Sequence, residues 1–144
     1  MKAFKFLENI ATADCAFLAF GKTKEELFEN AALALFEVMV ETKKVRSIFN
    51  FQFSIFNLNL EDLLFDFLSE LVFLKDEKGM VFSKFEVKIE KTQAPGYQLQ
   101  AEIWGEKIDS QRHNLKVDVK AVTRHLFKIK KEKDKFTARV VLDI

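Results

Sequence analysis

Carboxylates stand near both ends of the sequence, on segments that are otherwise apolar enough to form strands. Asp143 precedes the last residue, Ile144, whose main-chain carboxylate adds a second negative group, and Asp14 opens an apolar stretch. A lone carboxylate in such a stretch is costly unless something neutralises it. Ca²⁺, Mg²⁺ and Mn²⁺ prefer oxygen ligands, so the three groups could hold a cation if the two strands are neighbours. The simpler alternative, which the spacing alone favours, is that Asp14 caps a turn or pairs with a lysine.

The densest polar region lies between Gly105 and His125. It contains acids, an arginine, a lysine and two histidines, namely Glu106, Asp109, Arg112, His113, Asp118, Lys120 and His125. Histidine can exchange a proton near neutral pH, but a histidine in a loop more often serves as a hydrogen-bonding residue. Lys120 shares the strand parity of Asp118, so it is either a cation directed at a polar face or an ordinary surface lysine.

The sequence lacks the residue patterns needed for a phosphate-binding loop, for a zinc site and for catalysis by a thiol. The four glycines, at positions 21, 79, 96 and 105, are isolated, which argues against a phosphate-binding loop and an organic cofactor. Cys15, His113 and His125 are too few and too scattered for zinc. Cys15 lies among apolar residues, where an inert buried thiol is expected rather than a nucleophile.

The composition predicts a folded protein without a dominant charge. A chain of 144 residues with 49% hydrophobic residues and one proline can build one core, so we expect a single domain over residues 1–144. The 23 basic and 22 acidic residues leave a formal charge of +1, which provides no general attraction to nucleic acid or membrane. With one cysteine and neither a signal peptide nor a membrane-spanning run, the expected location is cytoplasmic.

Hydrophobic periodicity predicts the elements that position these residues. The predicted order is ββαβαββββ, with strands at 2–8 and 13–21, a helix at 23–40, a strand at 45–58, a helix from Asn59 to near Gly79, and strands at 84–90, 97–104, 117–130 and 136–143. Thr23 and Glu26 match a capping box, and Asn59 can cap the second helix. Because the later strands are joined by short turns, we expect an α+β fold with two helices packed on a largely antiparallel β-sheet.

Five blocks of the sequence resemble the archease family, and they follow one another in order along nearly the whole chain. The blocks are Thr12–Asp14 with Gly21–Thr23; Glu29–Phe36; Glu61–Leu64 with Asp66 and Glu70; Gly105–Glu106, Ile108–Asp109, Arg112–His113, Val119–Thr123 and His125; and Ala138–Ile144. The chain departs from the family pattern at Ala11, where histidine is common, at Lys107, where proline is common, and at Arg124, where an aromatic residue is common.

The resemblance implies an accessory protein and not an enzyme. Archeases act with an RNA-splicing ligase of the RtcB type, which uses GTP and a divalent metal to join RNA ends. The implied role is to promote guanylylation of the ligase and its multiple turnover in tRNA splicing or RNA repair, with tRNA contacted only indirectly. Asp14, Asp143 and the Ile144 carboxylate match the family's metal ligands, for Ca²⁺ or for Mg²⁺ or Mn²⁺. A polar motif that could face the ligase is matched by Glu106, Asp109, Arg112, His113, Lys120 and His125.

Two other classes of function stay open. Carboxylates and Mg²⁺ suit a stand-alone metal-dependent phosphohydrolase, although the sequence has no second acidic cluster for a two-metal centre. A chaperone-like or RNA-binding module would use exposed phenylalanines or the basic segment Lys128–Lys135, which is otherwise a solvated hairpin tip. The neutral net charge argues against direct binding of nucleic acid.

Overall fold

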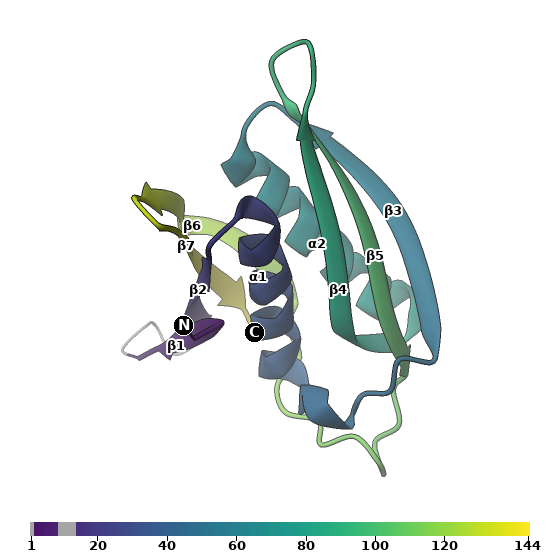
Figure 1. Ribbon diagram of the computed structural model, residues 1–144. Helices are drawn as coiled ribbons and strands as arrows, with labels where there is room; N and C mark the ends of the chain where they lie inside the picture. Colours follow the sequence, from purple (N-terminus) through teal and green to yellow (C-terminus); the bar gives the residue numbers. More distant parts are fainter. Residues whose placement is uncertain (1, 9–13) are drawn as a thin grey trace.

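The computed structural model describes residues 2–8 and 14–144, and its elements follow the predicted order (Figure 1). They are β1 (Phe4–Leu7), β2 (Asp14–Gly21), α1 (Lys24–Met39), the short 3-10 helix η1 (Thr42–Lys44), β3 (Phe49–Asn57), α2 (Leu60–Lys78), β4 (Met80–Lys91), β5 (Tyr97–Lys107), β6 (Ala121–Glu132) and β7 (Lys135–Asp143). The predicted α+β class and the order ββαβαββββ are confirmed. The connection between the first two predicted strands, with the departure at Ala11, lies outside the described residues.

The strands form two antiparallel sheets with the helices between them. One sheet has the order β1-β2-β7-β6 and the other has the order β3-β5-β4. Helix α1 packs against β2 of the first sheet and β4 of the second, while α2 packs against β6 and β3 (Figure 1). Each helix therefore touches both sheets. None of the helices in the described part of the chain is long and apolar enough to cross a membrane.

Phenylalanine rings join the layers of the core. Phe28 of α1 and Phe67 of α2 have ring centroids 5.8 Å apart, and both side chains are fully buried. Phe36 of α1 lies between Phe82 and Phe85 of β4, with centroid distances of 5.5 and 5.8 Å. Burying rings of this size supplies much of the apolar area that stabilises a core.

The helix ends use the side chains that the sequence predicts. The Thr23 hydroxyl accepts a hydrogen bond from the Glu26 N–H at 3.0 Å, and the Asn59 side chain accepts one from the Asp62 N–H at 2.9 Å. Gly79 ends α2 with a φ of 62°, a left-handed conformation that favours glycine. These caps satisfy backbone groups that a helix leaves without partners.

Several predicted strand boundaries are wrong, and two of these errors affect polar residues. Strand β5 continues to Lys107, so Glu106 lies on a strand and not in a loop. Strand β6 begins only at Ala121, because the preceding segment is held by the end of α1: the N–H groups of Lys116 and Val117 donate to the carbonyls of Met39 and Val38 at 2.8 and 3.3 Å. The expected shared strand parity of Asp118 and Lys120 is therefore not present.

We expect Asn59→Ala to lower the free energy of unfolding by about 1 kcal/mol, because it removes the side-chain cap of α2. Urea denaturation followed by circular dichroism measures the change. Asn59→Ser is the matched control, since its hydroxyl can still accept the Asp62 N–H. Equal stability of the alanine and serine variants would contradict this role of the cap.

Candidate functional site

The antiparallel pairing of β2 with β7 places Asp14 directly opposite Asp143. Residues that face one another in such a pair have Cβ atoms about 4.5–5.5 Å apart and lie on the same face of the sheet. Both side chains are half-buried, as is Ile144, which follows. Asp14 begins β2 and Asp143 ends β7, so the pair lies where these two central strands reach the end of the sheet, and we call it the acidic edge. The structure thus meets the condition that the sequence set for a shared site, namely that these two strands are neighbours.

The acidic edge also receives the start of β6. Asp143 faces Ala121 on its other side, and its carbonyl accepts the Lys120 N–H at 2.8 Å. This backbone bond keeps Lys120 beside the acidic edge, and the Lys120 side chain is exposed. Within the described residues neither Asp14 nor Asp143 forms an ion pair, so the alternative of a lysine partner for Asp14 finds no support. The turn that Asp14 could cap lies outside the described residues.

The donor set of the acidic edge fits a hard divalent cation better than zinc, because it consists only of carboxylate oxygens. Across residues 2–8 and 14–144, no group of three or more His, Cys, Asp or Glu side chains is arranged to hold a metal ion. The acidic edge supplies two such side chains. Further oxygen ligands would come from water, from a partner, or from the main-chain carboxylate of a chain ending at Ile144.

Glu106 is the centre of a second, buried polar cluster. Its side chain is hydrogen-bonded to the Arg46 N–H at 2.7 Å, to His113 Nε2 at 2.9 Å and to Arg112, which also donates to the Lys44 carbonyl at 3.1 Å. Burial alone would raise the pKa of Glu106, but the hydrogen bonds from Arg46, His113 and Arg112 outweigh it and lower the pKa to about 2. We call Glu106, Arg112 and His113 the Glu106 cluster.

His113 is fully engaged in this cluster. Its Nδ1 accepts the Asp109 N–H at 2.9 Å, so the ring proton lies on Nε2 and is donated to Glu106. The Asp109 carboxylate accepts the Gln111 N–H at 3.0 Å, which closes the turn. With both ring nitrogens occupied, His113 ties the loop after β5 back to the end of β5. Glu106 and Arg112 make the contacts with Arg46 and Lys44 on the neighbouring segment. This geometry favours the hydrogen-bonding interpretation of His113 over that of a base.

The structure therefore divides the predicted polar motif among three places. Glu106, Asp109, Arg112 and His113 lie together, and Lys120 lies beside the acidic edge. His125 is exposed on an irregular part of β6, where the register with β7 shifts between Thr123 and Lys128.

Sequence reasoning missed a buried cation on α2. Lys75 is 4% exposed, and its Nζ lies 2.6 Å from carboxylate oxygens of Asp118 and Asp76 and 3.0 Å from the Val119 carbonyl. Burial alone would lower the pKa of Lys75, but the bonds to Asp118 and Asp76 outweigh it and raise the pKa. The available signal was its spacing, since Lys75 follows Leu71 by four residues on the apolar face of α2. Asp118 thus has a structural partner.

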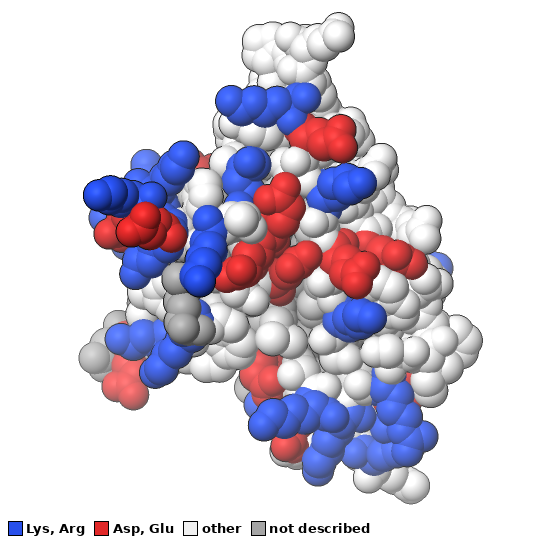
Figure 2. All heavy atoms as spheres, viewed as in Figure 1, with Lys and Arg blue, Asp and Glu red and all other residues white. Residues whose placement is uncertain are grey.

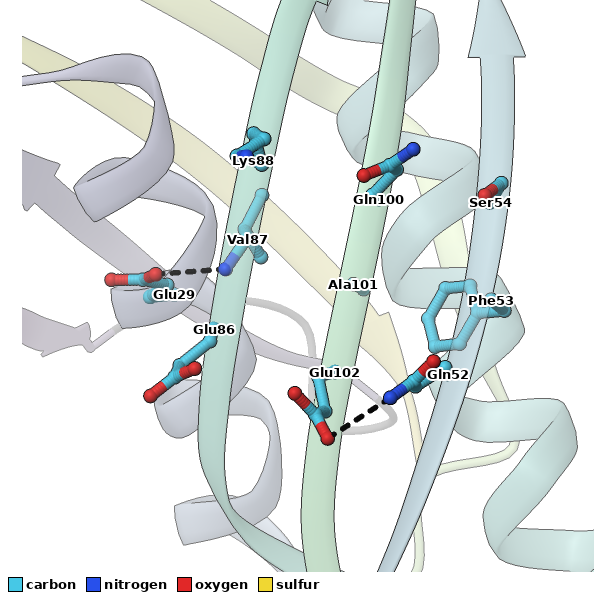
Figure 3. Close-up of a pocket in the computed structure, with 10 residues that line it drawn as sticks. All are labelled: Glu29, Gln52, Phe53, Ser54, Glu86, Val87, Lys88, Gln100, Ala101 and Glu102. Atoms are coloured by element: carbon cyan, nitrogen blue, oxygen red, sulfur yellow. Dashed lines mark hydrogen bonds between the residues drawn. The ribbon is translucent and has the colours of Figure 1, made fainter.

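The outer face of the β3-β5-β4 sheet carries a hollow of about 580 Å³ that is lined mainly by polar side chains (Figure 3). Glu29 of α1 reaches its rim and accepts the Val87 N–H at 2.9 Å, while Gln52 donates to Glu102 at 3.1 Å. Burial raises the pKa of Glu29, as does the charge of Glu86, and the Val87 hydrogen bond opposes this. Figure 2 shows acidic side chains gathered over this region.

A second hollow, of about 600 Å³, adjoins the Glu106 cluster. It is lined by the start of β3 and by the loop after β5, and includes the side chains of Ile48, Phe49 and Arg112. Neither hollow includes a residue of the acidic edge.

Comparison with known proteins gives a consistent result over the full chain. A family model described as "Archease protein family (MTH1598/TM1083)" matches residues 4–144. The chain is 43% identical over 145 residues to a protein named "Protein archease" from Pyrococcus abyssi, and 42% identical over 144 residues to one from Methanothermobacter thermautotrophicus; each match covers 100% of both chains.

Two solved structures are also similar. The solution structure of Methanobacterium thermoautotrophicum protein 1598 has a TM-score of 0.88 at 42% identity, with 100% of both chains covered. The crystal structure of TM1083 from Thermotoga maritima, described as an archease and possible chaperone, has a TM-score of 0.60 at 23% identity and covers 96% of this chain and 97% of its own. The second likeness concerns the fold alone.

We expect the Glu106 carboxylate to make stability depend on pH. Its pKa is lowered from 4.5 to about 2, so its contribution is fully present above pH 4.5 and is lost as pH falls from there toward 2. Glu106→Gln should lower the free energy of unfolding at pH 7 by about 1–3 kcal/mol and flatten this acid dependence. Urea titrations at several pH values measure both effects.

Glu102→Gln is the matched control, because Glu102 lies on the same strand but is less buried and accepts hydrogen bonds only from the neutral side chains of Asn50 and Gln52 among the described residues. It should retain the acid dependence of the unmodified protein. An unchanged pH slope in Glu106→Gln would contradict the proposed role of the cluster.

Proposed function

Because the chain belongs to the archease family, we propose that it is an accessory protein that activates an RNA-splicing ligase of the RtcB type. In this role it promotes GTP-dependent guanylylation of the ligase and its multiple turnover in tRNA splicing or RNA repair. It works in the cytoplasm, without membrane contact, and reaches tRNA only through the ligase.

The observation that carries this proposal is the cross-strand pair of Asp14 and Asp143 in a chain that matches the family model over residues 4–144. Two carboxylates on neighbouring strands repel each other unless a cation or a positively charged partner lies between them. The two aspartates have no ion-pair partner among the described residues. The acidic edge is therefore suited to receiving positive charge.

We infer that Asp14, Asp143 and the carboxylate of a chain ending at Ile144 would hold a divalent cation, Ca²⁺ or Mg²⁺ or Mn²⁺, without any organic cofactor. Such a cation would supply positive charge that can neutralise the triphosphate of GTP or order an acidic segment of the ligase. The backbone bond from Lys120 to Asp143 fixes the end of β7 relative to β6. The aspartates bind and orient, while the exposed Lys120 offers a cationic side chain beside them.

The environments of His113, Glu106 and Cys15 support an activator over a phosphohydrolase. Both nitrogens of His113 are engaged in hydrogen bonds, and the Glu106 carboxylate is shared among three donors. Burial raises the pKa of the Cys15 thiol, which disfavours the nucleophilic thiolate. These groups stabilise the fold in their present geometry.

We expect Asp14→Asn/Asp143→Asn to reduce the stimulation of multiple-turnover RNA ligation by about tenfold or more, because a neutral amide pair binds a divalent cation far more weakly. The assay combines this protein with an RtcB-type ligase and measures joined RNA per ligase. Asp134→Asn is the matched control, since it removes a carboxylate from the exposed tip of the β6-β7 hairpin.

Stimulation that is equal in the double variant and the control would contradict the proposed site. GTP hydrolysis by the protein alone would favour the phosphohydrolase alternative. Urea denaturation establishes that each variant is folded before the assays are compared.

We also expect a C-terminal extension to weaken cation binding more than an N-terminal extension of the same length, because it replaces the Ile144 carboxylate with a peptide bond. Isothermal titration calorimetry with Ca²⁺ and Mn²⁺ measures the difference. Equal affinity of the two extended proteins would remove Ile144 from the ligand set and leave the two aspartates to be tested separately.

A further inference from the structure

We propose that β3 is the interface of a symmetric dimer, in which the β3 strands of two copies of this chain pair antiparallel and join their three-stranded sheets. This inference is independent of the proposed ligase partner.

Strand β3 forms the free edge of its sheet. The strand order is β3-β5-β4, and Figure 1 shows no further element beyond β3 on that side. Within the described residues, no side chain forms a hydrogen bond with the backbone of Phe49–Asn57; the Asn57 side chain itself accepts the N–H of Leu58, which follows the strand. A row of backbone donors and acceptors thus faces outward along β3, and an unpaired row of this kind is a template for another strand.

The other long edges are covered by glutamates from the helices. On β4, the N–H groups of Val87 and Ile89 donate to Glu29 and Glu25 of α1 at 2.9 and 3.4 Å. On β6, the N–H of Ile129 donates to Glu61 of α2 at 3.0 Å. The remaining edge strand, β1, has only four residues. Helix glutamates therefore accept N–H groups of the edge strands β4 and β6, whereas β3 has no such bond among the described residues.

The sequence of β3 also lacks the features that usually protect an edge. Its nine residues, Phe-Asn-Phe-Gln-Phe-Ser-Ile-Phe-Asn, include no charge, no proline and no glycine, and their register with β5 is regular from end to end. Charged residues, proline and bulges are the common means of preventing unwanted pairing. By contrast, β4 and β6 both contain register shifts and several charged side chains.

The alternation of β3 makes it complementary to itself, which identifies a second copy as the occupant. A two-fold axis through Phe53 pairs all nine residues, sets Phe51 opposite Ile55 of the other copy, and sets Gln52 opposite Ser54. Every side chain then faces one on the same side of the joined sheet. Because β3 has no charged side chain, it offers no opposite charge to a partner strand that carries charges.

The inner face of β3 would gain burial from this pairing. Phe51, Phe53 and Ile55 are only half-buried. Their register partners on the central strand, Ile103, Ala101 and Leu99, are 0%, 4% and 0% exposed. The same side chains from a second copy would cover the open side of these three residues, and burial of apolar area favours association. The acidic edge belongs to the other sheet, so it stays accessible in the dimer.

Sedimentation velocity across a wide range of protein concentration tests the proposal. We expect the species of 16.8 kDa to be replaced by one of twice that mass as the concentration rises. Gln52→Lys/Ser54→Lys should raise the dimer dissociation constant by about tenfold or more, because each introduced cation faces another across the two-fold axis.

Gln98→Lys/Gln100→Lys is the matched control, since it adds the same charge to the same face of the sheet but on the central strand β5. This control should dimerise like the unmodified protein. A protein that stays monomeric at every concentration, or a dimer that persists equally in both variants, would overturn the proposal.

Amide hydrogen exchange gives a readout that needs no substitution. The amides of β3 should exchange more slowly at high than at low protein concentration, while those of β1 should not change. Exchange of β3 that is independent of concentration would also overturn the proposal.

Discussion

Each of the two helices packs against both sheets, so each must present apolar side chains in two directions. The rest of the structure depends on this constraint. Helix α1 meets this constraint by burying nine of its 16 residues, including Ala31, Ala32 and Ala34, whose small side chains allow close approach. The two sheets share no strand, so their relative position is set by α1 and α2. The acidic edge lies on one sheet and the Glu106 cluster at the end of the other. Their arrangement is thus a consequence of helix packing.

The end of α1 also connects these two polar regions. The segment after the Glu106 cluster is held by the carbonyls of Val38 and Met39 and continues to Lys120, whose N–H is bonded to Asp143. The buried charges of the molecule differ from those of the acidic edge in their partners. Glu106 and Lys75 are buried and fully partnered, which is typical of structural charges. The acidic edge is half-buried and has no ion pair among the described residues, which is the condition expected of a binding site.

The sequence was sufficient to predict features that depend on neighbouring residues. Helical spacing and the caps at Thr23 and Asn59 predicted both helices, and period-two alternation predicted the strands. It was insufficient where a distant group decides the outcome. Glu106 is buried because the Arg46 N–H, 60 residues away, reaches it. The start of β6 was misplaced because helix carbonyls compete for the backbone of Lys116 and Val117.

From the sequence, the candidate site could be predicted only on the condition that the strands of Asp14 and Asp143 are neighbours. Asp14 and Asp143 could be identified as acids on apolar segments, but their adjacency requires β2 to pair with β7, and only the fold provides that pairing. The sequence could not place Lys120 beside these aspartates for the same reason. Its position beside the acidic edge follows from one backbone hydrogen bond, which no periodicity indicates.

The proposed activator role is tested most directly by guanylylation of an RtcB-type ligase with GTP, measured with and without this protein in separate reactions containing Mg²⁺, Mn²⁺ or Ca²⁺. We expect the protein to increase the rate at which guanylylated ligase forms, and we expect the increase to depend on which cation is present. A guanylylation rate that is the same with and without the protein in all three reactions would contradict this role.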